Sequence, residues 1–111
     1  MIVKEVLLEE KRPTWIEAKA ILDIEFKNAR SSKTKCLVII HGYGSSGVGG
    51  TLRSRTRSYL REKLKNKSIK RFVFGENFWM YDPDSRYLIN TYSDLNYYYN
   101  KRNEGITIVE I

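Results

Sequence analysis

The sequence has very few of the residues that form covalent or metal cross-links. Its 111 residues include one cysteine, Cys36, and one histidine, His41. A single cysteine excludes an intramolecular disulfide, and one cysteine with one histidine does not make a structural zinc site. No apolar run approaches the roughly 20 residues that a membrane-spanning helix needs. We therefore expect a protein without a disulfide, a structural metal or a membrane span.

Three well-known glycine motifs are missing or incomplete. Residues 42–47 match the G-x-G-x-x-G pattern of dinucleotide-binding folds, but Lys67 stands where such a fold needs an acidic residue. The glycine run ends in Gly50-Thr51-Leu52 and lacks the Gly-Lys-Ser/Thr of nucleotide hydrolases. No G-x-S-x-G nucleophile elbow occurs. A hydrolase-like enzyme for a small anionic ester is therefore only a third alternative.

The amino-terminal residues do not have the pattern of a signal peptide. Residues 1–13, MIVKEVLLEEKRP, mix apolar and charged positions, whereas a signal peptide needs an unbroken apolar segment. Hydrophobic residues make up 41% and charged residues 30% of the chain, which is typical of a globular protein. We expect one cytoplasmic domain over residues 1–111 that does not associate with membranes.

Local patterns predict four strands and two main helices. Thr14 and Glu17 form a capping box that starts a helix with an apolar face, and this helix ends near Ser31. A second helix follows the glycines. The strands are expected over residues 2–9, 36–40, 69–74 and 105–111. The order βαβαββ predicts an α/β fold, a two-layer sandwich with a mixed four-stranded sheet.

The segment after the second expected strand predicts an anion-binding loop. Cys36–Ile40 is short, apolar and β-branched, which is typical of a buried strand. Glycine allows positive φ angles and close approach of a ligand to backbone N–H groups, and the following helix directs its amino-terminal dipole to the same place. The glycines that we expect to contact a phosphate are Gly42, Gly44, Gly47, Gly49 and Gly50.

The positive charge of the chain is concentrated in one segment. The formal net charge is +7, yet residues 51–71 alone carry nine basic residues and one acidic residue. Within this segment Arg53, Arg57 and Arg61 recur every four residues, which predicts one stripe along a helix. A stripe of arginines beside an anion-binding loop predicts a nucleic-acid partner, DNA or RNA. The alternative is a helix face that the charges only keep solvated.

Residues 75–104 form an aromatic-rich insertion that a minimal domain of this kind does not need. They include Phe78, Trp79, Tyr81 and five further tyrosines. We expect most of these rings to seal one end of the sheet. Exposed rings could instead stack on unpaired bases or bind a protein partner. Asp82–Ser85 predicts a turn before a short helix from Arg86 to about Tyr92.

Three separated motifs, in the right order, resemble the Smr (small MutS-related) domain. Thr14–Ala18 is similar to the opening helix of that family, Ile39–Gly44 followed by Gly49–Arg53 to its glycine-rich signature, and Gly105–Val109 to its closing strand. The resemblance implies a fold like the C-terminal domain of translation initiation factor three. It also implies nucleic-acid binding, with endonuclease activity in some members.

One departure from the family affects the expected chemistry. The family's other signature, Leu-Asp-x-His-Gly, corresponds here to Leu8–Arg12, so Glu9 keeps the acid while Lys11 and Arg12 replace histidine and glycine. Lysine stays protonated near neutral pH, so a proton-accepting imidazole is lost, whereas both cations can hold a phosphate. We expect binding with weak or absent cleavage, and in any cleavage Glu9 or His41 would assist the attack on the phosphodiester.

These patterns require no cofactor, and Mg²⁺ or Mn²⁺ would enter only if the chain is a nuclease. The rival function from another class is a non-catalytic interaction module, with the aromatic segment as its partner surface. The sequence does not predict an oligomeric state.

Overall fold

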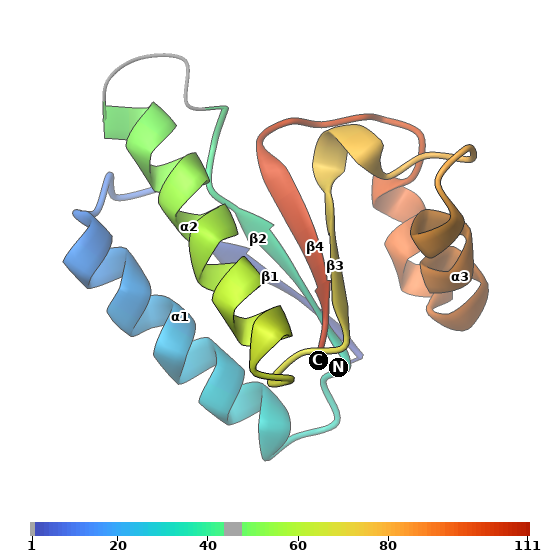
Figure 1. Cartoon of the computed structure of the whole chain (residues 1–111), viewed down its shortest axis with the longest axis horizontal. Helices are drawn as coiled ribbons and strands as arrows, with labels where there is room; N and C mark the ends of the chain where they lie inside the picture. Colours follow the sequence, from blue (N-terminus) through green and yellow to red (C-terminus); the bar gives the residue numbers. More distant parts are fainter. Residues whose placement is uncertain (1, 44–47) are drawn as a thin grey trace.

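The structure is a computed structural model, and it describes residues 2–43 and 48–111. Figure 1 shows the course of the chain from β1 to β4. The elements in chain order are β1 (Val3–Leu7), α1 (Trp15–Arg30), β2 (Cys36–Ile40), α2 (Val48–Lys65), β3 (Arg71–Phe74), the 3-10 helix η1 (Gly75–Asn77), α3 (Pro83–Thr91), the 3-10 helix η2 (Ser93–Tyr98) and β4 (Ile106–Glu110).

The last strand, β4, is inserted between two earlier ones in the sheet. The strand order is β1-β2-β4-β3, with β1 parallel to β2 and with β4 antiparallel to both β2 and β3. The helical crossover through α2 therefore carries the chain from β2 over β4 to β3. The carboxyl ends of β1, β2 and β3 consequently share one edge of the sheet, at the top of Figure 1, and α1 and α2 also begin at that edge.

The start and end of α1 follow from local hydrogen bonding. The Thr14 hydroxyl accepts the backbone N–H of Glu17 at 3.2 Å, and the Glu17 carboxylate accepts the backbone N–H of Thr14 at 2.9 Å. Such a capping box satisfies two N–H groups that the helix itself leaves free. Ser31 is the C-cap. The predicted capping box, apolar face and end of this helix are all confirmed.

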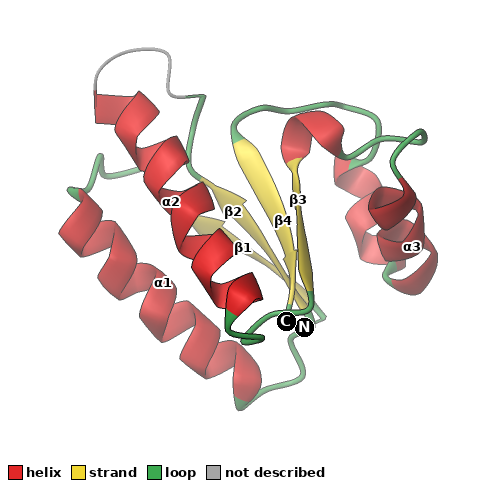
Figure 2. Ribbon diagram, viewed as in Figure 1, coloured by secondary structure: helices red, strands yellow, loops and turns green. Residues whose placement is uncertain are grey.

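The sheet is covered on both faces, so the fold has three layers. The sequence predicts a two-layer sandwich, with helices on one face only. Leu22 of α1 and Leu37 of β2 belong to the core between the sheet and the two main helices. On the other face, Phe78 and Leu88 belong to a second core that includes Val38 of the same strand β2. The residues between β3 and β4 therefore add a third layer, which Figure 2 shows beside the sheet, opposite α1 and α2. The mixed α/β fold with a four-stranded sheet is as predicted.

The helix of this third layer begins earlier than the sequence pattern predicts. α3 starts at Pro83 rather than at Arg86, and its N-cap Asp82 accepts the backbone N–H of Ser85 at 2.8 Å. Proline fits the first helical position because the N–H that it lacks has no partner inside the helix in any case. The Asp-Pro pair therefore starts the helix instead of forming a separate turn.

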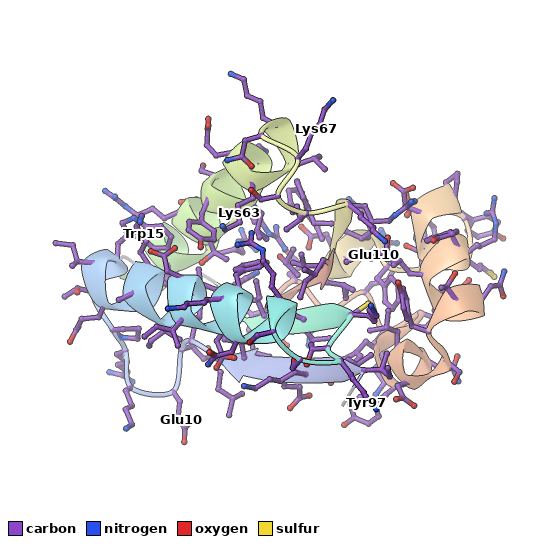
Figure 3. The ribbon with its side chains drawn as sticks, turned by 90° about the horizontal axis from the view of Figure 1, so that it is seen from below. Glu10, Trp15, Lys63, Lys67, Tyr97 and Glu110 are labelled. Carbon is purple, nitrogen blue, oxygen red and sulfur yellow. The ribbon has the colours of Figure 1, made fainter. Side chains whose placement is uncertain are left out.

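The aromatic side chains of residues 75–104 are divided between core and surface. Phe78 is fully buried, and Tyr92, Tyr98 and Tyr99 pack against the same core cluster. These rings are core residues, as predicted, but they cover one face of the sheet rather than one of its ends. Tyr97 remains 67% exposed, and Figure 3 shows it on the side of the molecule away from Trp15 of α1. Among the helices in the described ranges, none is both long enough and apolar enough to cross a membrane.

Candidate nucleic-acid interface

The edge at the carboxyl ends of β1 and β2 brings several predicted site residues together. Glu9 lies just beyond β1, and His41 and Gly42 directly follow β2. These strands are parallel and paired in register from Val3–Cys36 to Leu7–Ile40. The carboxyl ends of adjacent strands in an open α/β sheet are a common place for ligands.

The predicted glycines fall into three groups. Gly42 lies in the loop after β2. Gly49 and Gly50 lie in the first turn of α2, because this helix begins at Val48, earlier than the sequence predicts. The first N–H groups of a helix have no partner within it, so these two positions still provide backbone donors. Gly44 and Gly47 are outside the described residues.

Gly42 occupies a position that strongly favours glycine. Its φ is +86°, in the left-handed region, and a Cβ atom there would lie 2.3 Å from the Glu9 Oε2 atom. The backbone N–H groups of His41 and Gly42 both donate to the carbonyl of Gly105, each at 3.0 Å. The exposed Glu9 side chain therefore lies directly against a fixed glycine backbone.

Both ring nitrogens of His41 are already hydrogen-bonded inside the protein. Nδ1 is 2.9 Å from the Gly42 carbonyl, so it donates, and Nε2 accepts from the Thr107 hydroxyl at 2.9 Å. The side chain is only 1% exposed. Burial, aided by the positive charges of Arg57 and Arg53, lowers its pKa to about 4. The ring is therefore neutral near pH 7 and holds the loop in place.

Arg57 differs from the expected solvent-facing stripe. It is 7% exposed, and its guanidinium makes two hydrogen bonds with the Glu76 carboxylate, at 2.7 and 2.8 Å. Its Nε donates to Thr107 at 3.2 Å, and Nη2 donates to the Ile106 carbonyl at 3.2 Å. Burial would raise the pKa of Glu76, but the hydrogen bonds from Arg57 more than offset it and lower this pKa. Arg57 is thus held by the protein itself.

The other two arginines of the stripe remain accessible. Arg53 contacts Glu104 at 3.4 Å with a side chain that is 30% exposed. Arg61 is exposed, and its guanidinium lies 5.5 Å from the centre of the Phe74 ring. Exposed surface pairs of this kind contribute about 0–1 kcal/mol, so the Arg53 pair can exchange Glu104 for a phosphate at little cost.

Lys11 and Arg12 are exposed in the turn between β1 and α1. The backbone N–H of Arg12 donates to the Glu9 carbonyl at 3.0 Å, which closes this turn. Arg12 has a φ of +46°, a left-handed conformation that favours glycine. The family signature has glycine at this position, so the backbone geometry agrees with the alignment that the sequence resemblance implies.

Comparison with known families identifies the family of this chain. The family model of the Smr domain matches residues 12–78, which is more than half of the 111-residue chain. The chain belongs to the Smr domain family. Smr domains are generally linked to nucleic-acid binding and nuclease activity. No curated protein and no solved structure matches the chain.

The matched range of this Smr domain runs from the turn before α1 to the end of η1. It contains the glycine segment and the basic helix α2. Glu9 and Lys11 precede it, and α3, η2 and β4 follow it. The third layer therefore lies almost entirely outside the matched residues.

Sequence analysis missed three residues that shape the site of this Smr domain. Glu76 and Thr107 fix Arg57, and Gly105 binds the His41–Gly42 backbone. Nothing in the local pattern marks Glu76 or Thr107, because both act across long stretches of sequence. The sequence pattern of Gly105 indicates only a glycine turn at the start of the last strand.

The carboxylates of the site do not form a metal-binding cage. Within residues 2–43 and 48–111, no group of three or more His, Cys, Asp or Glu side chains is placed to hold a metal ion. The carboxylate of Glu76 forms an ion pair with Arg57, and that of Glu104 forms one with Arg53. The described residues of the site therefore do not fit a resident divalent cation.

Proposed function

We propose that this Smr domain binds the phosphate backbone of DNA or RNA at the edge formed by the ends of β1 and β2 and the start of α2. The observation that carries the proposal is the position of α2. Arg53 and Arg57 tie its amino-terminal half to residues 104–107, and the same turn binds His41 and Gly42. N–H groups without a partner inside the helix, the partly exposed Arg53 and a left-handed glycine therefore lie at the same edge of the sheet.

The charges farther along α2 support the same proposal. Five cations of residues 51–71 are exposed and make no ion pair with a carboxylate in the described part of the chain. These are Arg55, Arg61, Lys65, Lys67 and Lys70. Figure 3 shows Lys67 projecting from the far end of α2. Because unpaired charge of one sign repels itself, it is favourable only when an anionic partner or counterions neutralise it.

The arginine stripe in the sequence predicts that Arg57 contacts a phosphate, but in this proposal it has another role. Its guanidinium is enclosed and fully hydrogen-bonded, so it positions the site rather than contacting a phosphate. Direct contacts come from Arg53, Arg61, Lys11 and Arg12 and from backbone N–H groups. The phosphates would replace the weak surface contact of Arg53 with Glu104.

A salt series tests this proposal. The parent chain should bind labelled DNA or RNA, and the binding constant should fall steeply with salt, by a log–log slope of about 0.9 per neutralised phosphate. Arg53→Ala combined with Arg61→Ala should weaken binding and flatten the slope by about 2. Lys27→Ala with Lys33→Ala removes the same charge from exposed positions on and after α1, and should change both far less. Equal effects of the two double variants would contradict a defined interface.

Glu9 favours phosphodiester cleavage as a second candidate function. Its exposed carboxylate lies against the Gly42 backbone, at the proposed phosphate position. It would accept a proton from the attacking water, while N–H groups and Arg53 stabilise charge on the phosphate oxygens. His41 is less suited to this role because both of its nitrogens are occupied.

Cleavage is tested with highly purified parent, Glu9→Gln and His41→Gln proteins on end-labelled single-stranded and branched substrates, with and without Mg²⁺ or Mn²⁺. We expect weak or no cleavage, and any activity should disappear in Glu9→Gln. Robust activity that depends on His41 but not on Glu9 would overturn this assignment. Trace activity that is equal in all three proteins would leave a non-catalytic binding module. We propose a cytoplasmic location for either function.

A further inference from the structure

An exposed stack of rings and a guanidinium lies on the third layer of the sheet, outside the matched family core. Trp79 and Tyr81 contact each other edge to face, with ring centres 4.8 Å apart. The Arg102 guanidinium lies 4.0 Å from the centre of the Trp79 ring. Tyr81 is 67% exposed. We call Trp79, Tyr81 and Arg102 the aromatic platform.

The loops that carry the aromatic platform are fixed by hydrogen bonds. The backbone N–H of Met80 donates to the Asn100 side chain at 2.9 Å, and the N–H of Asn100 donates to the Phe78 carbonyl at 3.0 Å. Arg86 donates to the Met80 carbonyl at 2.7 Å. Tyr81 is therefore held outward on a well-ordered loop, and a ligand that binds it does not have to order the loop first.

Hydrogen bonds through Glu76 link the aromatic platform to the residues that shape the proposed phosphate site. Arg102 donates to the Glu76 carbonyl at 2.9 Å, and the carboxylate of the same Glu76 holds Arg57. Three residues after Arg102, Gly105 binds the His41–Gly42 backbone. The loops after β3 and before β4 lie at the same edge of the molecule as the end of β2 (Figure 1).

We propose that the aromatic platform stacks on an unpaired base of the strand whose phosphates occupy the proposed interface. The inference rests on the proposed function and specifies its substrate class as single-stranded or locally unpaired nucleic acid. An exposed tyrosine next to an arginine over an aromatic ring provides both stacking and positive charge, and any base can use this combination. A paired base inside a duplex has both of its faces covered by its neighbours and cannot stack in this way.

Tyr81 and Tyr87 provide a matched comparison. Tyr87 is 43% exposed, and the Arg71 guanidinium lies 4.1 Å from the centre of its ring. It also has a ring beside a guanidinium, although Arg71 is paired with Glu110 and Asp84 as well. Arg71 is the first residue of β3, so this pair lies at the opposite end of the strand from the proposed interface. Tyr87→Ala therefore controls for the loss of an exposed ring beside an arginine.

The test measures the affinity of the full chain for four labelled probes by fluorescence anisotropy. The probes are single-stranded DNA and RNA of one sequence, the corresponding DNA duplex, and a DNA strand with abasic sites that keeps the phosphates but lacks the bases. Tyr81→Ala should lose about 5-fold or more in affinity for the intact single strands. The same variant should bind the duplex and the abasic strand like the parent, and Tyr81→Phe should retain the parent affinity.

The outcomes separate this inference from the proposed function. A selective loss for single strands with bases, absent in Tyr87→Ala, supports the aromatic platform, and the DNA and RNA arms show which strand it favours. An unchanged single-strand affinity, or an equal loss on all four probes, overturns the inference while the parent's binding leaves the proposed function intact. If the parent binds none of the probes, the proposed function itself is wrong and the inference fails with it.

Discussion

A buried, neutral histidine makes the stability of this domain depend on pH. The pKa of His41 is lowered from 6.5 to about 4 in the folded chain, chiefly by burial. The unfolded state therefore binds more protons than the folded state between these two values. The contribution of the neutral His41 to the free energy of unfolding is therefore complete above pH 6.5 and is lost as the pH falls towards 4.

The first prediction is the size and origin of this pH effect. The free energy of unfolding, from urea titrations, should fall by about 2–3 kcal/mol between pH 6.5 and 4. His41→Gln should remove the slope between pH 5 and 6.5. Glu76, whose pKa is lowered, adds its own loss mainly below about pH 5, so the slope of stability above that pH reports on the histidine.

An independent measurement covers the case in which His41→Gln does not fold. His41 is the only histidine in the chain, so one set of imidazole proton signals reports its titration in the NMR spectrum of the parent. A titration midpoint near 6.5 in the folded protein would contradict the buried, hydrogen-bonded ring.

At the scale of elements, the ion pair between Arg57 and Glu76 connects α2 to η1, which follows β3. The Arg57–Glu76 pair has side chains that are 8% and 28% exposed. Arg57 also lies 4.0 Å from the centre of the Phe74 ring and donates to carbonyls of the turn before β4 and of β4 itself. Removing one partner of a buried pair leaves an uncompensated charge, which costs more than the pair itself contributes.

The second prediction follows from this asymmetry. Arg57→Met should lower the free energy of unfolding by about 3–5 kcal/mol, because Glu76 then loses both guanidinium hydrogen bonds. Glu76→Gln should cost less, because a glutamine side chain can still accept a hydrogen bond from Arg57 and because Arg57 keeps its bonds to Thr107 and the Ile106 carbonyl. The double variant should cost less than the sum of the two single variants, with a coupling of about 1–3 kcal/mol.

Urea titrations at pH 7 measure the cycle. Arg61→Met is the control, because Arg61 is on the same face of the helix but exposed, and it should change the stability by less than about 0.5 kcal/mol. Additive costs for Arg57 and Glu76 would show that the two side chains do not act as a pair.

Helical periodicity explains why the sequence predicted α2 but not the state of its arginines. A spacing of four residues predicts that Arg53, Arg57 and Arg61 share a face, but it does not say which other segment covers that face. The cover is supplied by Glu76 and Thr107, which are distant in sequence. The strands and the capping box of α1 were predictable because their signals are local, whereas the third layer depends on long-range packing of aromatic rings.

For the molecule as a whole, the two apolar cores lie on opposite faces of the same central strands. Leu37 and Ile39 of β2 point into the core under α1 and α2, and Cys36 and Val38 point into the core under α3. Because successive side chains of a strand point to opposite faces of the sheet, β2 contributes residues to both cores. If β2 left the sheet, both cores would be exposed to water. We therefore propose that residues 1–111 fold as one unit.

The third prediction tests this unit with one substitution in each core. Leu22 of α1 and Leu88 of α3 are both fully buried, so Leu22→Ala and Leu88→Ala should each lower the free energy of unfolding by about 2–5 kcal/mol. The chain has two tryptophans, with Trp15 packed beside Tyr59 and Trp79 beside Tyr81. Trp79→Phe and Trp15→Phe backgrounds therefore give separate fluorescence probes for the two sides of the sheet.

The two probes should report one common unfolding midpoint in urea, and each leucine substitution should shift both by the same amount, because a cooperative transition moves as a whole. A Leu88→Ala variant that shifts only the Trp79 signal, and leaves the Trp15 signal at the parent midpoint, would show that the third layer unfolds by itself. The sheet with α1 and α2 would then be the independent unit, and the aromatic platform would belong to a segment that can open without unfolding the rest.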